Sequence, residues 1–83
     1  MTYEQPIFNL GGRYRVKKSF KSGPIFTFIL GEILVFDRNS YSHYDNSFVY
    51  VFRAESDGKE KEWWLSEHDK KDVWKQHFEE LAR

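Results

Sequence analysis

Aromatic residues on both faces of short alternating segments constrain the fold of this 83-residue chain more than any other feature. Side chains alternate in direction along a strand, so segment 48–54 would place three aromatic rings on one face and two valines on the other. The consecutive Trp63 and Trp64 must likewise point to opposite faces. A single small core uses only one face of each strand. The second face therefore has to be covered by another part of the chain or by another molecule.

The composition indicates a chain that folds as one domain. It contains eight Phe, five Tyr and three Trp, whereas disordered chains of high charge are poor in such large apolar side chains. The length allows a single domain, 1–83, and excludes kinases, barrel enzymes and dinucleotide-binding enzymes with a second domain. Pro6 and the pair Gly11 and Gly12 set off an N-terminal arm, 1–12. The apolar side chains of this arm predict that it packs onto the body: Tyr3, Ile7, Phe8 and Leu10.

The central part of the chain, 13–66, has the periodicity of short strands. Extended segments are predicted at 13–20, on both sides of a bend at Gly31 within 25–36, at 48–54 and at 60–66. Clusters of polar residues, Gly and Pro predict turns at 21–24, 37–40 and 55–58.

The last segment, 67–83, changes to a helical period. Its apolar stripe recurs at the spacing of one helix face, with Trp74, His77, Phe78 and Leu81. Ser66 or Asp69 would cap the helix, which would cover one open end of the sheet. We therefore expect a mainly β protein with a C-terminal helix, either a small barrel or a strongly bent antiparallel meander of about five strands.

Two segments resemble the SH3-type barrel. Phe28 to Val35 is similar to the start of the second strand in that fold, where a Phe, two further residues, a Gly and an acidic residue follow one another. The segment from Glu55 to Trp64 resembles its later hairpin. The resemblance covers about 13–66, implies an SH3-like small barrel, and extends to small uncharacterised bacterial domains with the same Phe-x-x-Gly-Glu strand. The region from Lys17 to Phe28 is basic where a peptide-binding SH3 domain has an acidic loop, which argues against recognition of Pro-rich ligands.

The charges sum to zero but divide unevenly along the chain. Residues 1–38 contain six basic and three acidic residues, while 39–83 contain seven basic and ten acidic residues. Two faces of opposite sign, and head-to-tail association, could follow from this division. Without cysteine, a signal peptide or a continuous apolar run of membrane length, the chain is expected in the cytoplasm and not in a membrane.

Residue types that carry chemistry do not form an enzymatic pattern. The three histidines, His43, His68 and His77, lack the mutual spacing of metal ligands, so neither a metal nor another cofactor is expected. The loop 40–47 contains serines, a histidine and an aspartate, but neighbours in one loop rarely orient one another for nucleophilic attack. We expect a non-enzymatic protein, and a small enzyme that uses the loop Tyr41–Asn46 is the least favoured alternative.

Binding is the function that the residues favour. Tyr and Trp are enriched at interaction hot spots, and the predicted aromatic patch consists of Tyr41, His43, Tyr44, Tyr50 and Trp63. Charge from a basic strand with Arg13, Arg15 and Lys17 would border this patch. We expect a protein-interaction module, or a small regulatory or inhibitory protein, that binds a protein partner or a second copy of itself as a dimer. The alternative is a nucleic-acid-binding barrel, in which Lys18 and Lys21 join the basic strand.

Overall fold

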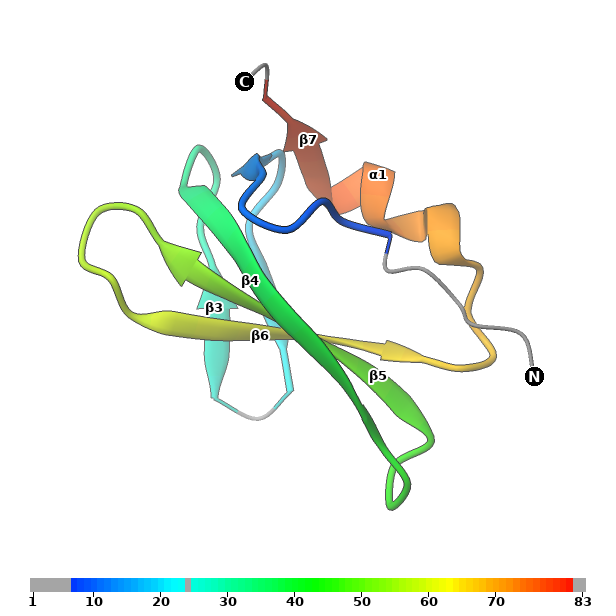
Figure 1. The fold of residues 1–83 in the computed structure, drawn as a ribbon. Helices are drawn as coiled ribbons and strands as arrows, with labels where there is room; N and C mark the ends of the chain where they lie inside the picture. Colours follow the sequence, from blue (N-terminus) through cyan, green and yellow to red (C-terminus); the bar gives the residue numbers. More distant parts are fainter. Residues whose placement is uncertain (1–6, 24, 82–83) are drawn as a thin grey trace.

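A computed structural model describes residues 7–23 and 25–81 (Figure 1). The elements are β1 (Arg13–Val16), β2 (Phe20–Ser22), β3 (Phe26–Phe28), β4 (Ile33–Ser42), β5 (Ser47–Ala54), β6 (Glu60–Ser66), the 3₁₀ turn η1 (Lys71–Val73), α1 (Trp74–His77) and β7 (Phe78–Glu80). The protein is thus mainly β, as predicted. Within the described part of the chain, no helix is long and apolar enough to cross a membrane.

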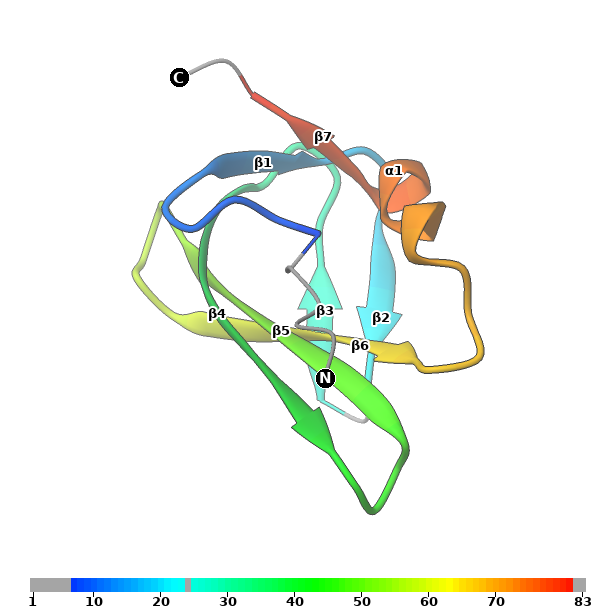
Figure 2. The ribbon, with the colours of Figure 1, turned by 45° about the vertical axis from the view of Figure 1, so that its right-hand side comes forward.

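The strands form one open sheet and one separate hairpin. Five strands are hydrogen-bonded in the order β6-β5-β4-β1-β7, β2 pairs only with β3, and all pairs are antiparallel. The hairpin of β2 and β3 runs across β6 in both views (Figures 1 and 2). The edge strands β6 and β7 do not pair with each other, so the described residues form no closed barrel. Of the two predicted architectures, the structure is the antiparallel meander, formed by β4, β5 and β6 and extended by β1 and β7.

The C-terminal segment contains a shorter helix than predicted. Only Trp74–His77 is α-helical, and Phe78 leaves the helix with the extended angles φ −127° and ψ 147°. Phe78 then pairs with Val16, and Glu80 pairs with Tyr14, so β7 satisfies the outer edge of β1. The prediction of a helix through Leu81 was wrong because pairing with β1 outweighs a weak local preference for helix. Phe78 still faces the core, where it is 1% exposed.

The N-terminal arm supplies the ring at the centre of the core. Phe8 is 2% exposed, and its ring centroid lies 5.0 Å from that of Tyr14, 4.9 Å from that of Phe52 and 5.2 Å from that of Trp74. These rings belong to β1, β5 and α1, so Phe8 fills the concave face of the open sheet. Leu10, by contrast, is 76% exposed, and Tyr3 lies outside the described residues.

A tight turn returns the arm to β1. The amide of Gly12 donates to the carbonyl of Asn9 at 2.8 Å, and the amide of Asn9 donates to the hydroxyl of Tyr14, also at 2.8 Å. A Cβ at residue 12 would approach the Asn9 carbonyl oxygen to 2.9 Å, so a larger side chain would force the turn open. Gly11 adopts φ 77°, which side chains disfavour. The glycine pair therefore fixes the path that holds Phe8 in place.

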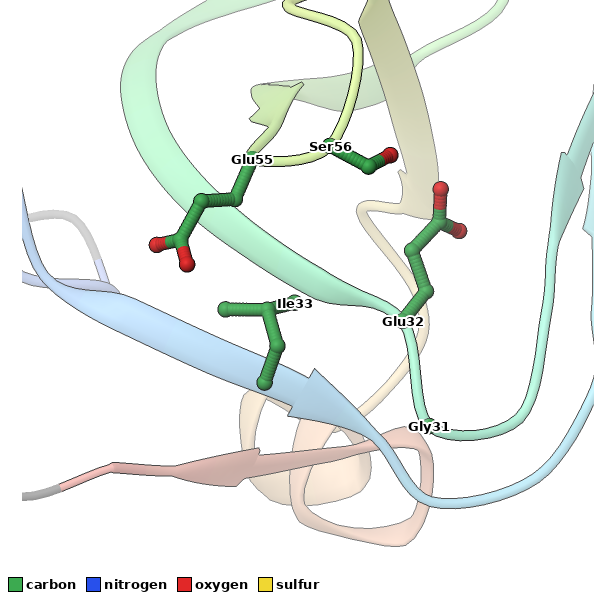
Figure 3. A pocket seen from close by; sticks show the side chains of 5 residues that line it. All are labelled: Gly31, Glu32, Ile33, Glu55 and Ser56. Carbon is green, nitrogen blue, oxygen red and sulfur yellow. The ribbon is translucent and has the colours of Figure 1, made fainter.

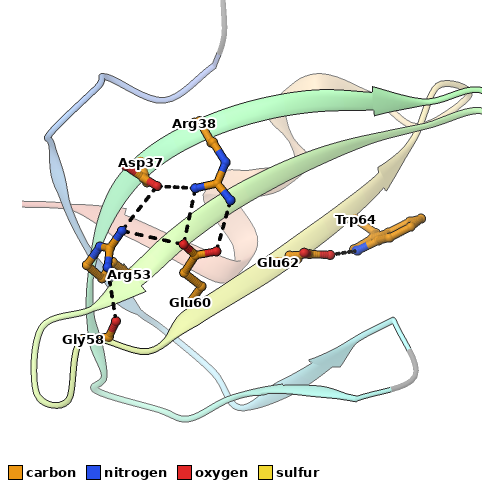
Figure 4. Close-up of polar contacts among 7 residues, drawn as sticks. All are labelled: Asp37, Arg38, Arg53, Gly58, Glu60, Glu62 and Trp64. Atoms are coloured by element: carbon orange, nitrogen blue, oxygen red, sulfur yellow. Dashed lines mark hydrogen bonds and ion pairs between the residues drawn. The ribbon is translucent and has the colours of Figure 1, made fainter.

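A β-bulge occupies the segment where the sequence predicted a turn. Residues 37–40 lie inside β4, and the register with β5 shifts between Phe36 and Arg38. A bulge of this kind lets two consecutive side chains lie on one face of the sheet. Asp37 and Arg38 accordingly both reach the outer face (Figure 4), where Arg38 pairs with Asp37 and, at 3.1 Å, with Glu60.

Charged side chains of the chain itself cover the second apolar face. Val51 is 4% exposed although it points away from the aromatic core, and its cross-strand neighbours on this outer face are Arg38 and Glu62. Arg38, Arg53 and Glu60 form ion pairs on this face, and long charged side chains of this kind can cover apolar surface while their charged ends stay in water. The surplus of apolar faces predicted from the sequence therefore does not by itself require a second molecule.

Ion pairs also join the basic half of the chain to the acidic half. Arg13 pairs with Glu55 at 2.8 Å, and Arg15 pairs with Glu79 at 3.5 Å. A third ion pair joins the two halves with the charges exchanged: Lys61 of the second half lies 2.7 Å from Glu32 of the first. Charges that are separated along the sequence thus neutralise one another across the sheet.

Replacing Phe8 by Ala should lower the free energy of unfolding by about 3–5 kcal/mol, because it removes the ring that fills the concave face and leaves a cavity. Urea denaturation followed by circular dichroism measures this change. The matched control is Leu10→Ala on the same arm, which should change stability by no more than about 0.5 kcal/mol because Leu10 is exposed. Equal losses in the two variants would contradict the central position of Phe8.

The position of His77 beside the aromatic core makes the stability of the fold depend on pH. Its ring centroid lies 4.5 Å from that of Phe20 and 5.8 Å from that of Trp63. Burial lowers the pKa of His77 below its ordinary value of 6.5, and the positive charge of Lys18 lowers it further. The unfolded chain therefore binds a proton more readily than the fold does. The stability contributed by neutral His77 is complete above pH 6.5 and is lost as the pH falls below that value.

Substitution His77→Gln should flatten the decline of stability between about pH 6.5 and pH 5, because glutamine does not titrate. Lys18→Gln should flatten the same decline in part, since it removes the repelling charge. Urea midpoints at several pH values measure both effects. An unchanged pH profile in His77→Gln would exclude His77 as the group responsible.

Candidate functional site

The structure separates the residues of the predicted aromatic patch. Tyr50 and Trp63 are 2% and 4% exposed within the core, so they cannot serve as surface anchors, and their assignment to the patch was wrong. Phe8 packs against both rings from the inside, at centroid distances of 5.3 Å and 5.8 Å. Tyr44 is 100% exposed in the turn between β4 and β5.

Tyr41 and His43 lie on the same hairpin but at the concave side of the sheet. Tyr41 is directly opposite Phe48, and its ring centroid is 5.2 Å from that of Phe48 and 5.0 Å from that of His43. The Tyr41 hydroxyl donates to Glu67 at 2.8 Å, and this hydrogen bond raises the pKa of Tyr41. Tyr41 therefore ties the hairpin to the segment after β6, and Tyr44 is the freely presented ring of the group.

The side chains of the predicted basic strand are engaged within the molecule. Arg13 makes two hydrogen bonds with Glu55, at 2.8 Å and 3.0 Å, and these raise the pKa of Arg13 and lower that of Glu55. Arg15 pairs with Glu79, and the Lys17 ammonium donates to the carbonyl of Lys75 at 3.0 Å. Phosphate groups would have to compete with these carboxylates, and no observation favours the nucleic-acid alternative.

The serines of the loop 40–47 support the turn. Ser42 Oγ donates to the Asp45 carboxylate at 3.2 Å, and Ser47 Oγ donates to the Asp45 carbonyl at 3.0 Å. Over the described ranges, no hydrogen bond joins His43 to a serine, and no group of three or more His, Asp or Glu side chains is placed to hold a metal ion. The loop thus has the contacts of a stable hairpin tip.

One surface hollow lies between the turn before β4 and the turn after β5. It has a volume of about 320 Å³ and is lined by Gly31, Glu32, Ile33, Glu55 and Ser56 (Figure 3). Both of its carboxylates already have internal cations, Lys61 for Glu32 and Arg13 for Glu55. Both carboxylates of this hollow are thus neutralised within the molecule, so it offers no unpaired charge to a ligand.

The second hollow lies on the outer face of the sheet, between two hairpins. It has a volume of about 610 Å³ and is lined by Gly23, Asp45, Ser47 and Trp64, and we call it the Trp64 hollow. Gly23 comes from the turn between β2 and β3, and Asp45 comes from the turn between β4 and β5. These two turns also present exposed apolar side chains, Ile25 at 77% and Tyr44 at 100% exposure.

Hydrogen bonds orient the half-buried Trp64. Its backbone amide donates to Ser22 Oγ at 2.8 Å, and its indole Nε1–H donates to Glu62 at 3.0 Å (Figure 4). The first contact holds the β2–β3 hairpin against the edge of β6, and the second holds the ring on the outer face beside Glu62. Gly23, with φ 63°, brings its backbone next to the ring, where a Cβ would lie 3.8 Å from Cδ1. The hollow is therefore built from a fixed ring and two fixed turns.

A partly buried ion pair anchors the hairpin that supplies Gly23. Lys61 of β6 lies 2.7 Å from Glu32, and the side chains are 18% and 14% exposed. The same ammonium donates to the carbonyl of Thr27 in β3 at 2.7 Å and lies 5.7 Å from the centre of the Phe28 ring. These contacts replace the strand pairing that β6 and β3 lack.

Sequence reasoning missed Trp64 and selected its neighbour. The alternation rule places Trp63 and Trp64 on opposite faces, but it does not say which face is buried. The pairing of Trp63 with Tyr50 on the concave side leaves Trp64 outside, opposite Val49. If the face of β5 that carries Tyr50 had been known to be buried, its partner Trp63 would have been placed inside and Trp64 identified as the accessible ring.

Comparison with protein-family models, with curated proteins and with solved structures found no match for this chain.

Substituting Met for Lys61 should destabilise the fold by about 1–3 kcal/mol, because a partly buried carboxylate loses its partner. Amide hydrogen exchange should also accelerate in segment 20–28, since the hairpin loses its tie to β6. The matched control is Arg15→Met in the exposed pair with Glu79, which should change stability by at most about 1 kcal/mol. Equal effects of the two variants, without faster exchange in the hairpin, would show that Lys61 does not anchor it.

Proposed function

We propose that this protein is a small non-enzymatic interaction module that regulates or inhibits a protein partner, with the Trp64 hollow as its binding surface. The observation that carries the proposal is the placement of an oriented, half-buried tryptophan between two turns with exposed Tyr44 and Ile25. Tryptophan and tyrosine dominate the energetics of protein interfaces because they bury large areas at little entropic cost.

The neighbouring elements support this use of the surface. The ring of Trp64 is held by Glu62, and its backbone is held by Ser22, so a partner would meet a preorganised site. Rigid strands position the hollow, while the exposed groups lie on turns, which is the usual arrangement of binding surfaces on small β proteins. From the sequence, we also propose that the protein is related to SH3-type domains and acts in the cytoplasm.

A second copy of the chain is the alternative partner. Light scattering of the purified protein distinguishes the two cases, because a dimer held through this surface would dissociate in Trp64→Ala and Tyr44→Ala. If the parent protein and both variants are monomers, the surface does not hold a second copy, and the expected partner is a different protein.

Quantitative affinity capture from the source lysate tests the proposal. Trp64→Ala and Tyr44→Ala should each reduce the recovery of a specific partner by about tenfold or more, since hot-spot truncations typically cost about 2 kcal/mol. Tyr44 is fully exposed, so its variant keeps the test meaningful if Trp64→Ala weakens the fold. The matched control is Leu30→Ala, which removes an exposed apolar side chain outside the hollow and should retain the partner. Equal recovery by all the proteins would refute the assignment of the surface.

A further inference from the structure

The Trp64 hollow has negative charge that forms no ion pair with the described residues, 7–23 and 25–81. Asp45 lines the hollow, and Glu62 lies beside it on the indole nitrogen of Trp64. Among the residues that the structure describes, neither carboxylate forms an ion pair. The nearest lysine along the β2–β3 hairpin, Lys21, precedes the buried Ser22 and therefore points to the opposite face of β2.

The other hollow provides an internal comparison. Its carboxylates, Glu32 and Glu55, are each paired with a cation of the chain. Within the described part of the chain, the carboxylates of that hollow have counter-charges, whereas Asp45 of the Trp64 hollow and the neighbouring Glu62 have none. Electrostatic complementarity then favours a positively charged occupant at this site.

The geometry points to a basic side chain of a partner segment, an arginine in preference to a lysine, as the occupant of the Trp64 hollow. A guanidinium group stacks on an indole face, where the negative face of the ring attracts it. Asp45 receives a hydrogen bond from Ser42, and a carboxylate has acceptor sites for further donors. The planar fork of arginine can donate to such a carboxylate while it remains stacked on a ring.

The fixed position of the indole ring strengthens this inference. Glu62 accepts the indole N–H, so Trp64 keeps one orientation, and the acceptor adds negative charge beside the ring. Ser47 is tied to the Asp45 carbonyl, which fixes the turn that carries the carboxylate. A cation would therefore enter a site whose ring and carboxylate are both held in place.

This inference rests on the proposed function, because it names the chemistry of the partner at the same surface. Its test uses the intact protein, labelled with ¹⁵N, and three synthetic peptides of sequence Gly-Ser-Gly-X-Gly-Ser-Gly. Residue X is arginine, lysine or citrulline, and citrulline has the shape of arginine without its charge. Chemical shifts of the Trp64 indole N–H and of the Asp45 amide report binding.

The arginine peptide should cause saturable shifts at both positions and bind about tenfold more tightly than the citrulline peptide. Asp45→Asn should weaken binding of the arginine peptide by about fivefold and leave the citrulline peptide unaffected. The matched control is Asp57→Asn, which changes an exposed aspartate in the turn after β5 and should leave the affinity of the arginine peptide unchanged. Equal affinities for arginine and citrulline, or no saturable shift at up to about 10 mM arginine peptide, would overturn the inference.

The outcomes separate this inference from the proposed function. If partner capture depends on Trp64 but the peptides do not differ, the surface is a binding site and the basic occupant is wrong. If the arginine peptide binds at Trp64 but no partner or second copy depends on that residue, the chemistry of the hollow is correct and the proposed function is wrong.

Discussion

An open sheet leaves its concave face to be filled by side chains from outside the sheet, and in this protein Phe8 of the N-terminal arm fills it. The ring lies among rings from β1, β5, β6 and α1, and it joins β1 to β5 and β6, with which β1 does not pair. A closed barrel would bring its edge strands together through backbone hydrogen bonds. Here the edge strands β6 and β7 do not pair, and aromatic packing, such as that of Trp63 against Phe78 at a centroid distance of 5.4 Å, provides the cohesion that closure would have supplied.

The small number of secondary-structure elements also determines how the outer face of the sheet is covered. Among the described residues there is one α-helix, of four residues, and it lies with the arm on the concave side of the sheet, so no helix covers the outer face of β5. The charged residues Arg38 and Glu62 are therefore the cross-strand neighbours of Val51 on the outer face, and the β-bulge at Asp37 brings a further charged residue to this face. Towards the hairpin tips these charged side chains give way to Trp64 and a hollow, so the candidate site lies where the charged cover ends.

The fold could be predicted to the extent that it depends on local pattern. Strand 48–54, the bend at Gly31 and the turn at Gly58 follow from alternation and from the freedom of glycine at positive φ, and the structure confirms them. The strand at 37–40, with its bulge at Asp37, could not be predicted, because polar residues of a strand that faces water have the same composition as a turn. The strand at Phe78 could not be predicted either, since its pairing partner lies some sixty residues away in β1.

The candidate site was predicted only in part, and for a similar reason. Tyr44 was selected for the aromatic patch and is fully exposed, whereas Trp63 was selected in place of Trp64 and is buried. The sequence by itself determined which segments extend and that both faces of the central strands are apolar, because side-chain alternation is a local property of the backbone. Only the tertiary structure decided which face is buried. That choice depends on how the arm, the hairpin and β7 pack against the sheet, and these contacts join residues that are far apart in the chain.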